Sequence, residues 1–318
     1  MTCSSVYTSA MDPLAALLEG PRAHGAFLLR SVLNPPWSLR IEDRAPLTLV
    51  AVVRGSAWVV PDEGEAVRLG EGDIVIVRGP EAYLVADDPG TPPQAVILPG
   101  DECRTPDGEH LTDLVDLGLR TWGHGLDGET IMLTGTYGMT GEISGRLLAA
   151  LPTLIVLRGA DWSSPLVPLL AEEMARDVPG QATVLDRLLD LLLISALRAW
   201  FARPDAPAWY RAHDDPIVGR TLRLMQHQPA EPWTVAKLAA EVGVSRAALA
   251  RRFTAALGEA PMTYLTNWRL ALAADQLRQY PEWTIGAIAH RVGYGGAFAL
   301  SAAFKRAYGV SPQRYRGE

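Results

Sequence analysis

Two stretches of this sequence repeat one pattern, and the repeat constrains the fold more than any other feature. VAKLAAEVGVSRAALARRFTAALG runs from Val235 to Gly258, and IGAIAHRVGYGGAFALSAAFKRAYG runs from Ile285 to Gly309. Matching positions are 50 residues apart before an internal turn and 51 apart after it. We call residues 235–258 the first motif and residues 285–309 the second motif. The chain must therefore build the same short unit twice.

The first motif is predicted to form two helices joined by a tight turn. The apolar residues at i, i+3, i+4 and i+7 of its first helix are Val235, Leu238, Ala239 and Val242. Thr234 is placed to cap this helix, and Gly243 is placed to end it, because glycine adopts the left-handed conformation of a sharp helix exit. Ser245 then precedes a second helix with Leu249 and Phe253 facing inward. This is the pattern of a helix-turn-helix, whose second, recognition helix enters the DNA major groove.

The second motif repeats these landmarks. Matching pairs are Trp233 with Trp283, Thr234 with Thr284, Leu238 with Ile288, Gly243 with Gly293, Phe253 with Phe304 and Gly258 with Gly309. Between the motifs, residues 261–279 have a helical pattern with Pro261 at the start, and 19 helical residues span about 28 Å. This length is close to one duplex turn of about 34 Å, which predicts two recognition helices in successive major grooves. A purely structural helical repeat is the alternative.

Charge is unevenly distributed along the chain. The formal net charge of -7 argues against a nucleic-acid partner for the chain as a whole. Residues 214–318, however, contain 13 Lys and Arg against 8 Asp and Glu, while the preceding 213 residues contain 16 against 28. Because salt confines an electrostatic field to roughly 10 Å, the local balance decides phosphate contact. The C-terminal third is therefore the predicted site of nucleic-acid contact.

The N-terminal half has a different pattern. Short apolar runs separated by Gly or Pro occupy residues 46–98 and predict a small antiparallel sandwich or barrel. Helical patterns follow at 165–177 and 181–202, and the second helix is apolar almost all round, so it is expected to be buried in its own domain or against a second copy of the chain. Residues 203–216 are Pro-rich and polar, as is typical of an interdomain linker.

The doubled motif, the joining helix and the ending VGYGGAFALSAAFKRAYGVSPQRYR resemble the AraC/XylS family of bacterial transcription regulators over residues 214–318. The N-terminal part resembles the cupin-like effector domains of that family. The resemblance implies an α+β two-domain protein: a cupin-like β-barrel with helices at 1–202, a linker at 203–213 and an all-α tandem helix-turn-helix domain at 214–318. It also implies promoter or operator DNA, a small-molecule effector and RNA polymerase as partners, and transcription activation. The apolar surface of the helix at 181–202 favours a homodimer through helices 165–202.

Helix geometry assigns candidate DNA contacts to the outward faces of both recognition helices. These residues are Arg246, Ala247, Ala250, Arg251, Thr254, Ala297, Phe298, Ser301, Ala302, Lys305 and Arg306. Arg251 is suited to bidentate bonding with guanine, and Arg246 to phosphate. The second face is more apolar than is usual in the family: Phe298 or its alanine neighbours are suited to thymine methyl groups, or Phe298 packs against its own fold. We therefore expect base discrimination mainly from the first motif and added affinity from the second.

The effector site is predicted in the barrel. No histidine lies between residues 25 and 109, and Tyr83 stands where a cupin motif places a metal-binding histidine, so we expect no metal, no cofactor and no catalysis. His110 and His124 are assigned structural or surface roles. Five aromatic residues are proposed to line a pocket: Trp37, Trp58, Tyr83, Trp122 and Tyr137. The alternatives are a cupin-type enzyme with an appended helical domain, or a regulator that responds to oxidation of Cys103 in the loop GDECRTPDG.

The cysteines, the first residues and the apolar stretches of the sequence bear on where the protein is located. Cys3 and Cys103 are the two cysteines, and their spacing suggests neither a disulfide framework nor a zinc site. The first residues lack the basic segment and apolar run of a signal peptide, and no apolar stretch reaches about 18 residues. We expect a cytoplasmic protein with no membrane partner. A non-catalytic protein that uses its repeat to bind another protein is the remaining alternative.

Overall fold

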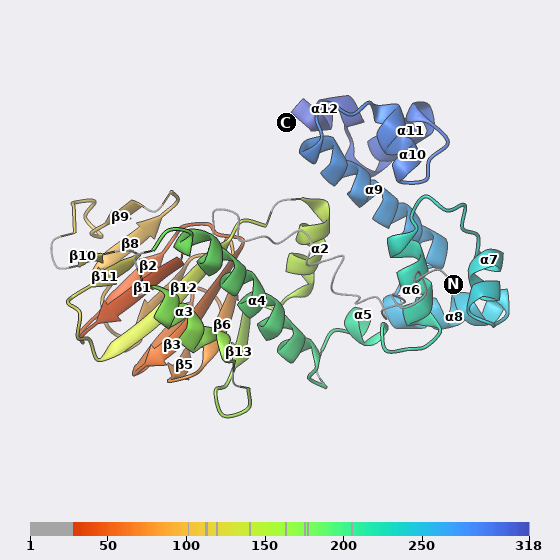
Figure 1. The fold of residues 1–318 in the computed structure, drawn as a ribbon. Helices are drawn as coiled ribbons and strands as arrows, with labels where there is room; N and C mark the ends of the chain where they lie inside the picture. The colour runs from red at the N-terminus through yellow and green to blue at the C-terminus, as the bar shows by residue number, and fades with distance from the viewer. Residues whose placement is uncertain are drawn as a thin grey trace. The chain divides into compact units, whose positions relative to one another are not determined.

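The computed structural model describes residues 28–317, except 101, 112–113, 119, 140, 163, 175, 177 and 205 (Figure 1). Cys3 lies outside these residues. The chain divides into two units, which we call the β unit and the helical unit. The β unit includes Pro21–Met139 and Leu148–Arg203, and the helical unit includes Thr140–Leu147 and Pro204–Glu318. Within the described residues, no helix is long and apolar enough to span a bilayer.

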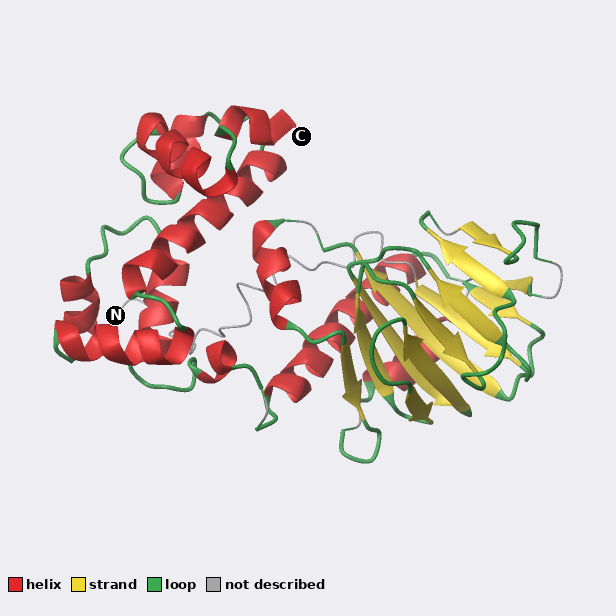
Figure 2. Cartoon of the chain, turned by 180° about the vertical axis from the view of Figure 1, so that it is seen from behind, coloured by secondary structure: helices red, strands yellow, loops and turns green. Residues whose placement is uncertain are grey.

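The β unit contains two sheets packed against each other, drawn in yellow in Figure 2. Among the described residues, one sheet has seven strands in the order β10-β11-β1-β12-β3-β6-β13. They are β1 (Leu28–Leu33), β3 (Leu47–Arg54), β6 (Ile74–Arg78), β10 (Val115–Gly118), β11 (Thr121–Gly123), β12 (Thr130–Tyr137) and β13 (Leu154–Leu157). The other has six strands in the order β5-β4-β7-β2-β8-β9. They are β2 (Ser38–Ile41), β4 (Ser56–Pro61), β5 (Val67–Gly70), β7 (Tyr83–Ala86), β8 (Ala95–Leu98) and β9 (Glu102–Arg104).

Strand β3 is buried on both faces, so it does not alternate between apolar and polar residues. Val50 and Val52 face the core between the sheets, while Leu49 and Ala51 are buried on the opposite face. Helices α3 (Leu166–Met174) and α4 (Gln181–Phe201) cover that face (Figures 1 and 2). A strand between two covered faces reads as a continuous apolar run.

Helix α4 approaches strand β12 closely. A Cβ atom on Gly135 would lie 2.7 Å from Cδ2 of Leu189, so the lack of a side chain at residue 135 permits this contact. The Tyr137 hydroxyl donates a hydrogen bond of 2.9 Å to the Leu189 carbonyl oxygen, and its burial raises the pKa of Tyr137. Although α4 is apolar almost all round, only one face is buried in the β unit, and Val184 and Leu191 are 44% and 51% exposed.

The helical unit contains both repeated motifs. Its helices include α5 (Ala208–Arg211), α6 (Val218–His227), α7 (Val235–Glu241), α8 (Arg246–Leu257), α9 (Pro261–Gln279), α10 (Ile285–Arg291), α11 (Ala297–Tyr308) and α12 (Pro312–Gly317). The Thr234 and Thr284 hydroxyls accept the backbone N–H groups of Lys237 and Ala287, each at 3.1 Å, and thereby cap α7 and α10.

The turns and cores of both motifs confirm the predicted repeat. Gly243 and Gly293 follow the first helix of each motif with φ angles of 70° and 87°, a region that glycine enters without strain. Leu249 and Phe253 are completely buried in the first motif, and their counterparts Leu300 and Phe304 are completely buried in the second. Ser245 caps α8 as expected, whereas α11 begins after Gly296 without a side-chain cap.

Helix α9 joins the two motifs and contributes to both of their cores. Leu265 packs in the first core, and Leu270 and Leu277 pack in the second. The Arg269 guanidinium donates hydrogen bonds of 2.7 Å to the carbonyl oxygens of Pro229 and Glu231. These contacts hold both motifs on one helix, which spans the residues 261–279 that the sequence predicted to be helical.

Helix α2 (Glu142–Ala150) follows β12 in the sequence, but its first two turns pack within the helical unit. The Asp275 carboxylate accepts the N–H groups of Glu142 and Ile143 at 2.6 and 3.2 Å. Burial raises the pKa of Asp275 despite these two hydrogen bonds. The Tyr315 hydroxyl donates to Glu142 at 2.7 Å. This arrangement was not foreseen from the sequence.

The structure bears on the predicted fold class, strands, linker and position of Cys103. The two-domain fold class is confirmed, and the apolar runs in 46–98 correspond to strands β3 to β8. Cys103 was assigned to a loop, which is wrong: it lies in strand β9, opposite Ile97 of β8. The proposed linker at 203–213 contains helix α5, and its residue Ala212 is buried in the core of the first motif. The exact domain boundaries stay a prediction.

Candidate nucleic-acid interface

Helix α8 presents a basic outward face. Arg246, Ala247, Arg251 and Thr254 are exposed, and Ala250 is half-buried. The Arg251 guanidinium forms no hydrogen bond or ion pair with any residue that the structure describes. It is therefore available for an external acceptor, and a guanidinium bonds in a bidentate manner to guanine O6 and N7.

The neighbouring Arg252 has a structural partner. Its Nε donates to Asp215 Oδ2 at 2.7 Å, which joins α8 to the start of α6. Asp215 also accepts the N–H groups of Ile217 and Val218 at 2.9 and 3.0 Å. Partial burial opposes the charge on Asp215, but the Val218 N–H, the Arg252 guanidinium and the Ile217 N–H together hold its pKa below the usual range. Two adjacent arginines on α8 therefore have different environments.

Helix α11 presents a largely apolar outward face. Ala297, Phe298, Ala302, Lys305 and Arg306 are exposed, and Ser301 is half-buried. Phe298 is 90% exposed, which rules out the alternative that its ring packs against the fold. Lys305 and Arg306 lie in the last turn of the helix, where their charges suit contact with phosphate groups.

A cation from each motif lies over the indole ring that precedes that motif, a feature that sequence reasoning missed. The Lys237 ammonium lies 4.7 Å from the centre of the Trp233 ring, and the Arg291 guanidinium lies 4.0 Å from that of Trp283. The repeated Trp-Thr pair was the available signal. The cations differ in position within the two motifs, so the shared geometry is not evident from the alignment of the repeats.

The five aromatic residues predicted to bind an effector do not converge on one cavity. Trp37 and Tyr83 are buried in the core between the sheets, and Trp122 packs against that core. Trp58 follows the inward-facing Ala57 of β4 and therefore points to the opposite face of its sheet. Tyr137 lies under α4, where its hydroxyl bonds to Leu189.

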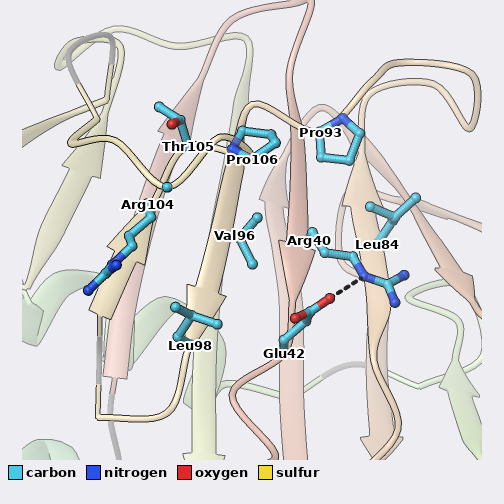
Figure 3. A pocket seen from close by; sticks show the side chains of 10 residues that line it. Arg40, Glu42, Leu84, Pro93, Val96, Leu98, Arg104, Thr105 and Pro106 are labelled. Carbon is cyan, nitrogen blue, oxygen red and sulfur yellow. Dashed lines mark hydrogen bonds and ion pairs between the residues drawn. The ribbon is translucent and has the colours of Figure 1, made fainter.

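A separate groove of about 660 Å³ lies along the six-stranded sheet, and none of those five residues lines it (Figure 3). Its lining residues are Arg40, Glu42, Leu84, Pro93, Val96, Leu98, Arg104, Thr105, Pro106 and Gly108. The Arg40 guanidinium pairs with Asp62 at 2.5 Å and with Glu42 at 3.1 Å. These hydrogen bonds raise the pKa of Arg40, and the bond to Asp62 has the larger effect. Since Arg40 is already paired, apolar surface is the main feature that this groove offers. The apolar outward positions of β8 were the missed sequence signal.

Within the described residues, no group of three His, Cys, Asp or Glu side chains could hold a metal ion. His124 has a structural contact, because its Nδ1 accepts the backbone N–H of Asn34 at 3.0 Å. The Tyr83 side chain is fully buried, and burial raises the pKa of its hydroxyl. Cys103 is half-buried and not in a disulfide.

Comparisons with known proteins cover nearly the whole chain. A cupin family model matches residues 12–202, and a helix-turn-helix domain model matches residues 238–318. A putative AraC-like transcription regulator of Streptomyces lividans is 31% identical over 313 residues, which cover 96% of this chain and 98% of the relative. The HTH-type transcriptional regulator AlkR of Acinetobacter baylyi is 28% identical, with 96% and 99% covered.

A solved structure of the DNA-binding domain of AdpA in complex with a target DNA is also similar to part of this chain. It is 29% identical, with a TM-score of 0.31, and the match covers 32% of this chain and 90% of that domain. The chain is thus similar to transcription regulators over 96% of its length.

Proposed function

This chain belongs to the AraC-like family of transcription regulators, and from that premise we propose that it binds operator DNA under the control of a small molecule held by its cupin domain. Recognition helices α8 and α11 enter successive major grooves of one duplex. Arg251 bonds to guanine, and Arg246, Lys305 and Arg306 contact phosphates. The remaining predicted contacts, Ala247, Ala250, Thr254, Ala297, Phe298, Ser301 and Ala302, face the base edges.

One observation carries this proposal: both recognition helices have exposed outer faces and are held on the single helix α9. Because each phosphate contact releases counterions, log K for DNA is expected to fall linearly with log salt. Affinity that does not change between about 50 and 200 mM salt would contradict phosphate-driven binding.

The effector is proposed to bind between the two sheets, next to Trp37, Tyr83 and Trp122. The Trp37 Nε1–H group is buried, and it has no hydrogen-bond partner among the described residues. A buried donor without an acceptor is costly, so an acceptor atom of an effector is a fitting partner. Trp58 and Tyr137, which were also predicted as contacts, lie on other faces and do not belong to this site. Effector binding then shifts the population of chain conformations that bind DNA.

A thermal-shift screen of small molecules tests this site. A molecule that raises the melting temperature of the wild type should have a much smaller effect on the Trp37→Phe variant, which keeps an aromatic side chain, although a smaller one, and lacks the N–H donor. Equal shifts for both proteins would place the effector elsewhere, and the groove beside Arg40 would then be tested in the same way.

We also propose a homodimer through helices 165–202. Leu169 on α3 and Val184 and Leu191 on α4 are exposed apolar residues, and burying such side chains against a second copy stabilises association. Leu191→Glu is expected to shift the protein to monomer in sedimentation velocity. Leu126→Glu, which alters a residue that is 69% exposed elsewhere in the β unit, should not. A wild type that is monomeric at all concentrations would refute this interface.

Contact with RNA polymerase and activation of transcription in the cytoplasm complete the proposal. The decisive test is sequencing of genomic DNA recovered with the protein, with and without candidate effectors, followed by transcription of the recovered promoters with purified polymerase. Recovery of a shared sequence with two elements about one helical turn apart is the expected result. Random recovery would refute sequence-specific regulation.

A further inference from the structure

Phe298 is the most exposed large apolar side chain in the described residues, at 90%. It is also the sole aromatic residue among the large apolar side chains that are exposed there. An exposed phenyl ring forgoes the stabilisation that burial gives, which amounts to about 25 cal/mol for each Å² of apolar surface. The position of Phe298 on α11 indicates what covers this ring.

Phe298 is the second residue of α11, and it lies on the stripe that faces away from the core. Leu300 and Phe304 are completely buried on the inner side of this helix. Phe298, Ala302 and Lys305 follow at i, i+4 and i+7 on the outer side. In a helix-turn-helix the N-terminal residues of the recognition helix contact base edges, so Phe298 occupies a base-contacting position.

The repeat provides an internal comparison. With the offset of 51, Phe298 corresponds to Ala247 of the first motif, and Ala302 corresponds to Arg251. The second motif therefore has alanine where the first has the Arg251 guanidinium, and it has a phenyl ring where the first has Ala247. These two positions lie one helical turn apart on the same stripe. Lys305 and Arg306 remain for phosphate contact near the end of the helix.

A phenyl ring has no hydrogen-bond donor or acceptor, so it cannot read the polar pattern of a base pair. The apolar feature of the major groove is the C5 methyl group of thymine. We propose that Phe298 recognises thymine by this methyl group, so that the operator has one half that depends on guanine and one half that depends on thymine methyl groups. This inference rests on the proposed function, because it requires that α11 enters the major groove.

Thymine-to-uracil substitution tests the inference, because it removes the methyl group and leaves the Watson–Crick edge unchanged. An operator is first selected with the wild-type chain from a random duplex library. Each thymine is then replaced singly by deoxyuridine, and Kd is measured by fluorescence anisotropy. Loss of one contacted methyl group is expected to weaken wild-type binding about fourfold. The Phe298→Ala variant should bind the thymine operator more weakly and should be insensitive to the same uracil.

Matched controls separate a methyl contact from other effects. Phe298→Leu retains an apolar side chain and should keep part of the uracil sensitivity. Uracil in the guanine-dependent half should affect the wild type and Phe298→Ala equally. Because Phe298 is 90% exposed, its replacement should leave the melting temperature unchanged.

The inference is overturned if no uracil in the selected operator weakens wild-type binding, or if the same uracil weakens Phe298→Ala to the same degree. In both cases the selected operator still demonstrates sequence-specific binding, so the proposed function stands. Failure of the wild type to select any duplex is a different result, and it refutes the proposed function itself.

Discussion

Replacement of Arg251 by alanine removes an exposed guanidinium from the outer face of α8. Because Arg251 has no hydrogen-bond partner among the described residues, the change should leave the melting temperature of the chain unaltered. A bidentate arginine–guanine contact contributes about 1–3 kcal/mol of discrimination against other bases, which corresponds to about 5- to 150-fold in Kd. In Arg251→Ala, the preference for guanine should disappear completely at the one base pair that Arg251 contacts.

Anisotropy titrations with an operator and its single-base variants measure the effect. The wild type should discriminate strongly at one guanine in the half read by the first motif. Arg251→Ala should bind all four bases at that position with similar affinity, and its ranking of bases at the other positions should match the wild type.

Arg252→Ala is the control, because it removes an adjacent guanidinium that bonds to Asp215 at 2.7 Å. The pair is partly exposed, so its loss should lower stability by at most about 1 kcal/mol and leave the ranking of bases unchanged. The reasoning is refuted if Arg251→Ala keeps the wild-type ranking at every position, or if it loses affinity equally for the operator and for unrelated DNA.

Two further predictions concern the stability of the helical unit. Thr284→Ala removes the cap of α10 and should destabilise this unit by about 1 kcal/mol in thermal denaturation. Thr266→Ala, which alters an exposed threonine within α9, should destabilise it less. Equal effects of the two substitutions would contradict a capping role. Asp215 has a lowered pKa in the folded state, so its contribution to stability is present above about pH 4 and is lost as the pH falls through the folded pKa. The melting temperatures of wild type and Asp215→Asn should therefore differ at pH 7 and converge toward pH 3, and a constant difference would refute this assignment.

The repeated motifs were predictable from the sequence because their determinants are local. Thr234, Gly243 and Phe253 each act within one or two helical turns, and the same spacing recurs at Thr284, Gly293 and Phe304. Apolar runs likewise located strands β3 to β8, because each run is bounded by turn residues. Predicted helices 165–177 and 181–202 correspond to α3 and α4 for the same reason.

Features that depend on distant partners were not predictable. The contact of Asp275 with Glu142 joins residues 133 positions apart, and no local pattern announces it. The parallel pairing of β1 with β11 and of β2 with β8 also requires knowledge of the whole topology. The exposure of Val184 and Leu191 on α4 depends on how much of the helix the sheet covers, which periodicity does not reveal.

The spacing of the two operator halves tests the central claim most directly, since α9 sets the separation of the two recognition helices. Kd should be measured for the selected operator and for operators with five or ten base pairs inserted between the halves. Five base pairs turn the second half to the opposite side of the duplex, and ten move it by about 34 Å along the axis. The account predicts that both insertions reduce affinity to that of a single half. Unchanged affinity in either case would contradict simultaneous reading of two adjacent grooves by one chain.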